Sequence, residues 1–250
     1  MRVRRLCLSD DREQRREMLE RTWMATLEVL STDHHAGLRL GPPLSADRHF
    51  VQIVLDEFES VAARFPILFT KHPETGAFYA GALLGLKPGE NIAAGSGDGA
   101  AVDRLFDLVR QGFFISGDHI AIDPAHTRFV RAGGQPVFDD GGTPAVALRR
   151  VQSALSQLHA GLPQTEQFLK RLLALKLVEP IDLSFRFDDG ERLALEGLYT
   201  ISRDALAELD DAAVIDLFRQ GDLALAHAVL GSQHHISRLA HLRNDRLVGG

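Results

Sequence analysis

The segment 181–187 reads Ile-Asp-Leu-Ser-Phe-Arg-Phe, a strict alternation of apolar and polar residues. Side chains along a β-strand point to opposite faces in turn, so this period of two predicts a half-buried strand. Asp189 and Gly190 follow as turn residues, and 193–201 returns as a second extended segment. Two strands joined this closely pair antiparallel, which argues against a fold made of parallel βαβ units.

Helices are expected elsewhere between short strands. Thr143 and Pro144 supply a hydroxyl N-cap and a proline at the first helical position, so a helix is expected from there to 159. Gly161 and Pro163 are expected to end it before another helix begins. Further strands are expected at 50–55, 67–71, 77–86 and 113–122. Further helices are expected at 56–64 and 102–110, after Pro163 as far as 177, and at 210–244 with a break at Gly231. The expected class is α+β, with a hairpin-rich antiparallel sheet, several packed helices and a C-terminal helical segment.

Composition excludes several classes of protein. Only one of the 250 residues is cysteine, Cys7, which rules out a disulfide framework and favours a reducing compartment. The 28 basic and 34 acidic residues give a formal charge of −6, which argues against a general nucleic-acid binder. No run of about 18 apolar residues occurs, so no transmembrane segment is expected. The first residues lack an apolar signal-peptide core, and we therefore expect a cytoplasmic protein.

The N-terminal segment stands apart by its dense charge. Between 9 and 30, apolar residues recur at helical spacings among acidic and basic ones, which predicts an amphipathic helix; they are Met18, Leu19, Trp23, Met24 and Leu27. Interleaved Asp and Glu favour packing on the protein or on a partner over binding to a membrane surface. The expected organisation is a helical extension over 1–28 followed by a single α+β domain over 29–250.

Histidines are prominent near the C-terminus. His227, His234 and His241 are spaced seven apart, so the three imidazoles are expected on one stripe of a helix, with His235 beside them. Imidazole is a ligand for haem iron, non-haem iron and zinc. Seven residues span about 10.5 Å of helical rise, too far for two of these groups to bind one ion directly. Solvated or half-buried helix histidines are therefore the alternative to a haem or iron site.

Motifs of several common enzyme classes do not occur. Gly95, Gly97 and Gly99 lack the dinucleotide-binding spacing, and no glycine loop is followed by Gly-Lys-Ser or Gly-Lys-Thr. The sequence also contains no Gly-x-Ser-x-Gly nucleophile motif. Function therefore has to be sought in other stretches.

Several separated stretches together resemble the SapC family, named after a bacterial S-layer secretion-associated protein. The most specific is Leu-Leu-Gly-Leu at 83–86 followed by Gly-Glu-Asn at 89–91. Asp-Arg-His-Phe-Val at 47–51, with Glu-Phe at 57–58, is similar to a second block of the family. Further similar stretches lie at 30–40, 65–69, 136–149, 196–199 and 232–239. The resemblance extends over 28–243.

This resemblance implies a soluble accessory or binding protein rather than a particular reaction. Members of the family are linked by name to surface-protein secretion. They tend to be encoded near TonB-dependent receptors and near flavin-dependent halogenase-like or cupin-like proteins. The implied partner is a protein of a secretion, uptake or modification locus. Two alternatives stay open: a histidine-ligated haem or iron protein, such as an oxidoreductase, and a metal-free enzyme acting on a peptide or sugar.

Four residues of the similar stretches form the candidate ligand-binding set. His35 and His49 carry imidazoles that titrate near neutral pH, which suits acid–base or ligand-binding roles. Glu90 and Asn91 follow a Pro-Gly turn, where such side chains either face a pocket or cap the next segment. We expect the loops bearing these four residues to meet around a common cavity. The alternative is a structural role for each of them.

Overall fold

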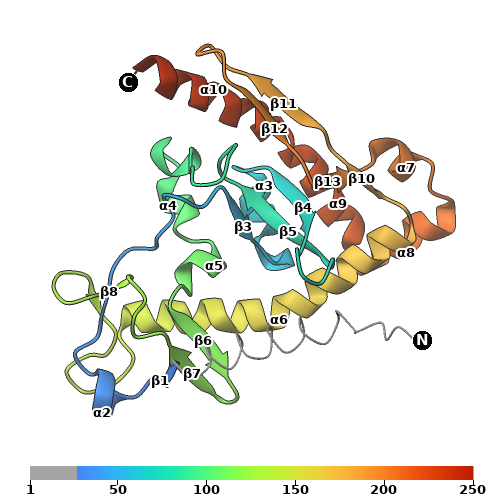
Figure 1. Cartoon of the computed structure of the whole chain (residues 1–250). Helices are drawn as coiled ribbons and strands as arrows, with labels where there is room; N and C mark the ends of the chain where they lie inside the picture. The colour runs from blue at the N-terminus through green and yellow to red at the C-terminus, as the bar shows by residue number, and fades with distance from the viewer. Residues whose placement is uncertain (1–26, 250) are drawn as a thin grey trace, which may run out of the picture. The chain divides into compact units, whose positions relative to one another are not determined.

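The computed structural model describes residues 27–249, which divide into two compact units (Figure 1). Unit one contains 27–41 and 112–149, and unit two contains 42–111 and 150–249. Both contain antiparallel sheets, and helices end the chain, so the expected α+β class is confirmed. The expectation of a single domain over 29–250 stays a prediction.

Unit one holds two small antiparallel sheets. Their strand orders are β1-β7-β6 and β8-β2-β9, and helix α2 lies between β1 and β2 in sequence. The strand expected over 113–122 forms a hairpin of two strands. The elements are β1 (Glu28–Val29), α2 (Thr32–His35), β2 (Arg39–Leu40), β6 (Phe113–Ser116), β7 (His119–Ile122), β8 (Phe129–Val130) and β9 (Gln135–Pro136).

The helix expected over 9–30 falls mostly outside the described residues. Its last positions are not helical, because Glu28 and Val29 pair with Ile122 and Ala121 of β7. The backbone groups there are engaged by a neighbouring strand rather than by a helical turn, so this end of the prediction is wrong.

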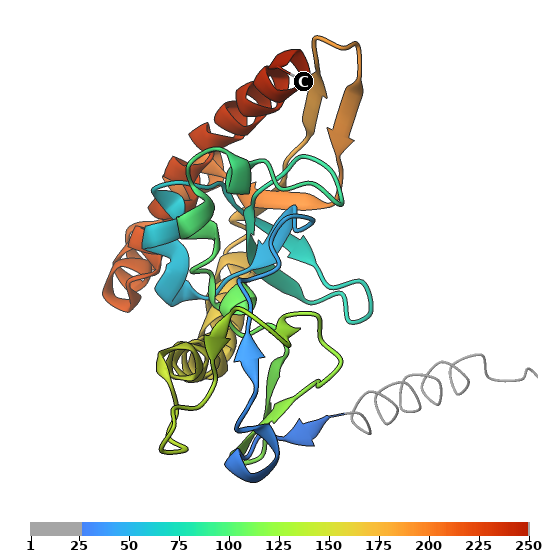
Figure 2. The same cartoon turned by 90° about the vertical axis from the view of Figure 1, so that its left-hand side faces the viewer.

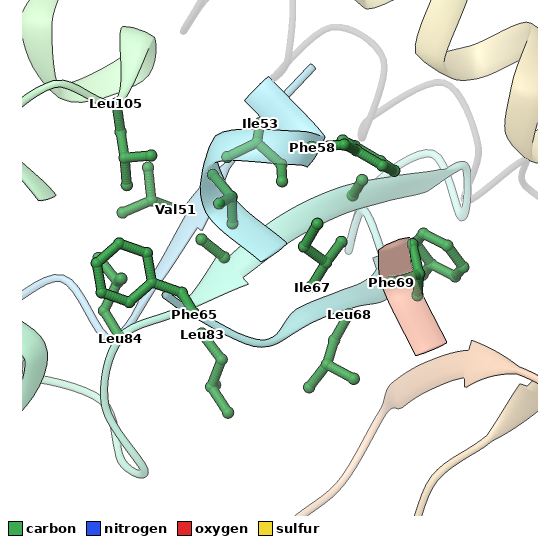
Figure 3. Close-up of a cluster of buried hydrophobic side chains, with 14 of the residues drawn as sticks. Val51, Ile53, Phe58, Phe65, Ile67, Leu68, Phe69, Leu83, Leu84 and Leu105 are labelled. Carbon is green, nitrogen blue, oxygen red and sulfur yellow. The ribbon is translucent and has the colours of Figure 1, made fainter. Parts of the chain in front are cut away.

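Unit two is organised around a five-stranded antiparallel sheet in the order β10-β13-β4-β5-β3. The strand expected at 67–71 is confirmed to the residue, and its hairpin with the next strand is confirmed as well. Side chains from β3, β4, β5 and α3 gather in one buried core (Figure 3). The strands are β3 (Phe50–Gln52), β4 (Ile67–Lys71), β5 (Phe78–Leu83), β10 (Val178–Pro180) and β13 (Leu198–Ile201).

The hairpin expected around Asp189 and Gly190 is confirmed as β11 (Leu183–Arg186) paired with β12 (Arg192–Leu195). Its side chains alternate between half-buried and exposed, as the period of two requires. This hairpin lies beside helix α10 (His234–Gly249) in two perpendicular views (Figures 1 and 2). The backbone N–H of Asp188 donates to the side-chain oxygen of Asn244, which joins the two elements.

Helix α6 (Val146–Ala174) runs without the break expected at Gly161 and Pro163. A Cβ added at Gly161 would lie 2.7 Å from the Cβ of Val54, so this glycine permits close packing rather than ending the helix. Pro163 lies inside the helix and is exposed, and it costs one backbone hydrogen bond there.

The start of α6 also differs from the expected one. The hydroxyl of Thr143 donates to the carboxylate of Asp139 at 2.6 Å, so it belongs to a turn instead of capping the helix. The remaining short helices are η1 (Leu55–Glu57), α3 (Phe58–Ala62), η2 (Ala93–Gly95), α4 (Gly99–Val102) and α5 (Phe106–Val109). The helix expected at 56–64 is thus η1 with α3, and the one expected at 102–110 is two separate turns.

The C-terminal helical segment is confirmed, but its break is elsewhere. Gly231 lies inside a helix, whereas Gly221 adopts φ +80° and ends one, a left-handed conformation that glycine adopts without strain. A second break occurs at Gln233. The helices are α7 (Arg203–Ala207), α8 (Asp211–Gln220), α9 (Asp222–Ser232) and α10.

Candidate functional site

Two cavities of about 500 Å³ each adjoin one another in unit two, and Phe50 and Tyr79 line both of them. The two rings meet edge to face, with centroids 6.0 Å apart. Phe50 lies on edge strand β3, against Gly81 of β5, where an added Cβ would collide with the ring. The shared aromatic wall therefore depends on strand pairing and on a glycine that leaves room for it.

The first cavity, called the Arg48 cavity, has a basic polar side. Arg48 Nη2 lies 3.2 Å from one carboxylate oxygen of Asp107, and Arg110 Nε donates to the other at 2.9 Å. Asp107 thus orients two guanidinium groups at once. Burial raises the pKa of the Tyr79 phenol, against the opposing effect of the Arg48 charge. Its hydroxyl therefore stays protonated near neutral pH and can donate a hydrogen bond.

The second cavity, called the His49 cavity, is mainly apolar. Leucine side chains of β5, β12 and β13 line it, together with the half-buried His49 and the exposed Lys87 and Glu196. Burial lowers the pKa of His49, the positive charge of Arg48 lowers it further, and Glu90 opposes both. His49 is therefore a neutral imidazole at neutral pH, able to donate one hydrogen bond and accept another.

Glu90 and Asn91 line neither cavity. Glu90 accepts a hydrogen bond from Arg243 Nε at 3.0 Å. The Asn91 amide donates to the Ser45 carbonyl and accepts from the backbone N–H of Ala94, both at 2.8 Å. The second carboxylate oxygen of Glu90 accepts from the backbone N–H of Leu86 at 3.3 Å, so the polar atoms of both side chains have partners within unit two.

Gly85 explains why this loop holds its shape. A Cβ at Gly85 would collide with the backbone carbonyl of Glu90, as expected for a glycine at a close backbone approach. The loop therefore folds back on the end of β5, and its acidic and amide side chains point toward residues that anchor it.

Arg243 on α10 is the residue that sequence reasoning missed. It is 3% exposed, donates to Glu90 and to Glu191 at 2.6 Å, and places its guanidinium carbon 4.3 Å from the centroid of the Phe187 ring. Burial tends to lower the pKa of Arg243, but the two carboxylates outweigh it and the pKa is raised. No local pattern around Arg243 indicates this cluster, because its acidic partners lie in segments that are distant along the chain.

His35 belongs to unit one and has its partners there. Its Nε2 lies 3.2 Å from the Glu28 carboxylate, and its Nδ1 accepts from the backbone N–H of Ser31 at 3.1 Å. His35 is 9% exposed and lines none of the cavities described here. Of the four candidate residues only His49 lines one, and a cavity shared by all four stays a prediction.

The C-terminal histidines do not share one helix. His227 lies on α9, whereas His234, His235 and His241 lie on α10 beyond the break at Gln233. Three of the four are exposed, and buried His235 places Nε2 3.1 Å from the Ala62 carbonyl. Within 27–249, no three His, Cys, Asp or Glu side chains come together as ligands of a metal ion. The residues expected to hold haem or iron thus form no such cluster.

Glu57 belongs to a stretch that resembles the family but was not among the candidate site residues. It is 4% exposed, and its two carboxylate oxygens accept from the backbone N–H groups of Val54 at 3.1 Å and Phe106 at 2.9 Å. Burial raises the pKa of Glu57 from 4.5 to about 7, although both backbone hydrogen bonds oppose the rise. Since Phe106 begins α5, this carboxyl holds the element that carries Asp107 and ends before Arg110.

Comparison with known protein families gives a match over most of the chain. Residues 30–239 match the family model described as SapC. No curated protein and no solved structure matches the chain. No helix in the described part of the chain is both long and apolar enough to cross a bilayer.

Proposed function

Because this chain belongs to the SapC family, we propose that it is a binding protein, serving as an accessory to surface-protein secretion or to TonB-receptor-linked uptake. The observation that carries the proposal is the pair of cavities with a common wall of Phe50 and Tyr79. Ligand sites are commonly concave, largely apolar and supplied with a few oriented polar groups. Each cavity, at about 500 Å³, has the size of a small-molecule site.

The polar groups of the Arg48 cavity favour binding over acid–base chemistry. Asp107 accepts hydrogen bonds from two arginines, so its oxygens are engaged in orienting them. The raised pKa of Tyr79 makes its phenol a hydrogen-bond donor rather than a base. Arg48 and Tyr79 therefore present donors to whatever occupies the cavity.

Ligand retention tests this proposal. The protein purified from its native host is denatured, and the released small molecules are identified by mass spectrometry and returned to the protein in a thermal unfolding experiment. A ligand that binds the folded state raises the unfolding temperature. We expect this shift to vanish in Phe50→Ala and to persist in Phe218→Ala, the same change at a ring that is 73% exposed on α8. Equal shifts in both variants would contradict binding in these cavities.

The accessory role needs a protein partner, and affinity capture from the native host tests it. The expected result is recovery of a component of a surface-protein secretion or TonB-receptor system. Capture that yields no such component, in cells that express the locus, counts against the role. The same cells, fractionated, test the expected cytoplasmic location.

Two alternatives from the sequence have direct tests. Haem would give a Soret absorption band in the purified protein, and iron would appear in elemental analysis. Loss of the Soret band or of the iron in His235→Ala would support the haem or iron alternative. A metal-free enzyme acting on a peptide or sugar would require a catalytic group, for which the neutral His49 is the candidate. Turnover abolished by His49→Ala would support an enzyme and oppose a pure binding role.

A further inference from the structure

Arg48 presents hydrogen-bond donors that the described part of the chain does not use. Its Nη2 contacts Asp107, and its Nε and Nη1 make no hydrogen bond with other residues in 27–249. The side chain is 39% exposed and lines the Arg48 cavity. A guanidinium has five N–H donors in a planar fork, which matches the two oxygens of a carboxylate.

The surroundings fix this guanidinium in place. Asp107 is 12% exposed and holds Arg48 on one oxygen and Arg110 on the other. Asp107 itself lies on α5, whose first N–H is bonded to the buried Glu57. Because the supporting carboxylate is held by a second element, the donor fork is oriented before a ligand arrives, which lowers the entropic cost of binding.

The guanidinium of Arg48 favours an anionic head with one planar pair of oxygens. Among its described lining residues, two arginines face Asp107 and Glu166. The Glu166 carboxylate is paired with Lys170 Nζ at 2.6 Å. The donors of Arg48 that Asp107 does not take form a single planar fork, which the two oxygens of one carboxylate fill.

The cavity also has apolar lining residues suited to an apolar body. The rings of Phe50 and Phe78 and the side chains of Leu162 and Leu169 line it. Tyr79 lines the same cavity, and its hydroxyl supplies a second hydrogen-bond donor. A ligand with an aromatic-sized apolar body and one acidic head satisfies both kinds of lining residue.

We propose that the Arg48 cavity binds a monocarboxylate with an aromatic or similarly sized apolar body, the carboxylate on Arg48 and Tyr79 and the body against Phe50 and Phe78. This inference rests on the proposed binding function, since it assigns a ligand class to the same site. It concerns recognition only and involves no chemical step.

Calorimetric titration of the full chain with four probes tests the ligand class. The probes are 3-phenylpropionate, its neutral amide, acetate and phenyl phosphate. We expect 3-phenylpropionate to bind more tightly than the other three. The amide lacks the charge, acetate lacks the apolar body, and the tetrahedral phosphate fits one planar donor fork less well than a carboxylate does. Tighter binding of phenyl phosphate would overturn the carboxylate assignment in favour of a phosphate head.

Variants test the residue. Arg48→Ala should weaken 3-phenylpropionate binding by about tenfold to a hundredfold, because a charge-assisted hydrogen bond is lost. Arg219→Ala, at an exposed arginine of α8, should leave binding unchanged. Tyr79→Phe should produce a smaller loss. Unchanged affinity in a folded Arg48→Ala variant would overturn the proposal.

The outcomes separate this inference from the proposed function. If the amide binds as tightly as the acid and both depend on Phe50, the cavity binds ligands but the acidic class is wrong. If none of the probes binds, the monocarboxylate proposal fails, while a host-derived ligand sensitive to Phe50→Ala would still support a binding protein. If no probe binds and no host-derived ligand is found, both proposals fail.

Discussion

Two polar stretches of unit two invite comparison, the approach to β3 at 48–50 and the loop at 85–91. Both belong to stretches that resemble the SapC family, and both carry charged or imidazole side chains. In the first, Arg48 lines one cavity and His49 lines the next. In the second, Glu90 and Asn91 end in hydrogen bonds with Arg243, Ser45 and Ala94.

The difference teaches that a polar motif is a site only where its groups keep unused hydrogen-bonding capacity. Asn91 is 6% exposed, and a buried amide has to be satisfied inside the protein. The Arg48 side chain is 39% exposed, so part of its donor fork remains available. We call 48–50 the open stretch, because it faces the cavities. We call 85–91 the closed stretch, because its side chains fasten the loop to the C-terminal helix and to neighbouring backbone.

Removing Arg243, the basic partner of the closed stretch, should have the largest effect on stability. Arg243→Ala removes the buried guanidinium that binds Glu90 and Glu191 and leaves them only the weaker contacts with Leu86 N–H and Lys87, and we expect a loss of about 3 kcal/mol in unfolding free energy. Urea unfolding measures it. Arg186→Ala, at an exposed arginine of β11, is the control and should change stability by less than about 0.5 kcal/mol. Similar values for the two variants would show that the cluster does not fasten α10.

Glu57 supports the open stretch by holding α5, which carries the Asp107 partner of Arg48. Its titration should change the unfolding free energy with pH in a definite direction. Its pKa is higher in the folded state than its ordinary 4.5, so the folded state holds the proton more tightly. This stabilisation is complete below pH 4.5 and is lost as the pH rises through about 7, by about 3 kcal/mol. Urea unfolding across that range should show the decline, and Glu57→Gln should flatten it. Exposed Glu59→Gln should retain the wild-type profile.

Asn91 tests the closed stretch on a smaller scale. Asn91→Ala removes the partners of the Ser45 carbonyl and the Ala94 N–H, and we expect a loss of about 2 kcal/mol. Asn91→Asp keeps the acceptor for Ala94 but sets a buried carboxylate oxygen against the Ser45 carbonyl oxygen, so it should cost at least as much as the alanine variant. Chemical denaturation measures both. An affinity for 3-phenylpropionate that falls in Asn91→Asp would place this loop in the binding site after all.

Arg48 should have the smallest effect on stability. Its pair with Asp107 is partly exposed, and such pairs contribute about 0–1 kcal/mol, so Arg48→Ala should unfold at nearly the wild-type urea concentration. Arg110→Ala, at the other arginine that pairs with Asp107, is measured in the same way. A destabilisation as large as that of Asn91→Ala would make both stretches structural and remove the contrast.

Local sequence patterns predicted the elements well where the physical cause is local. The strand at 67–71 and the hairpin around Asp189 follow from alternation and turn residues, and both were confirmed. The break expected at Gly161 was wrong because Val54, more than a hundred residues away, packs against that glycine. The candidate site was predicted only in part, since His49 lines a cavity but the partners of Glu90 and Asn91 come from distant segments.

By itself, the sequence determined the α+β class, the antiparallel hairpins and the stretches that resemble the SapC family. Periodicity and turn preference act between near neighbours, and a chain carries them wherever it folds. Only the tertiary structure decided which polar side chains are satisfied and which face a cavity. That outcome depends on burial and on partners such as Asp107 and Arg243, whose distance along the chain leaves no local pattern.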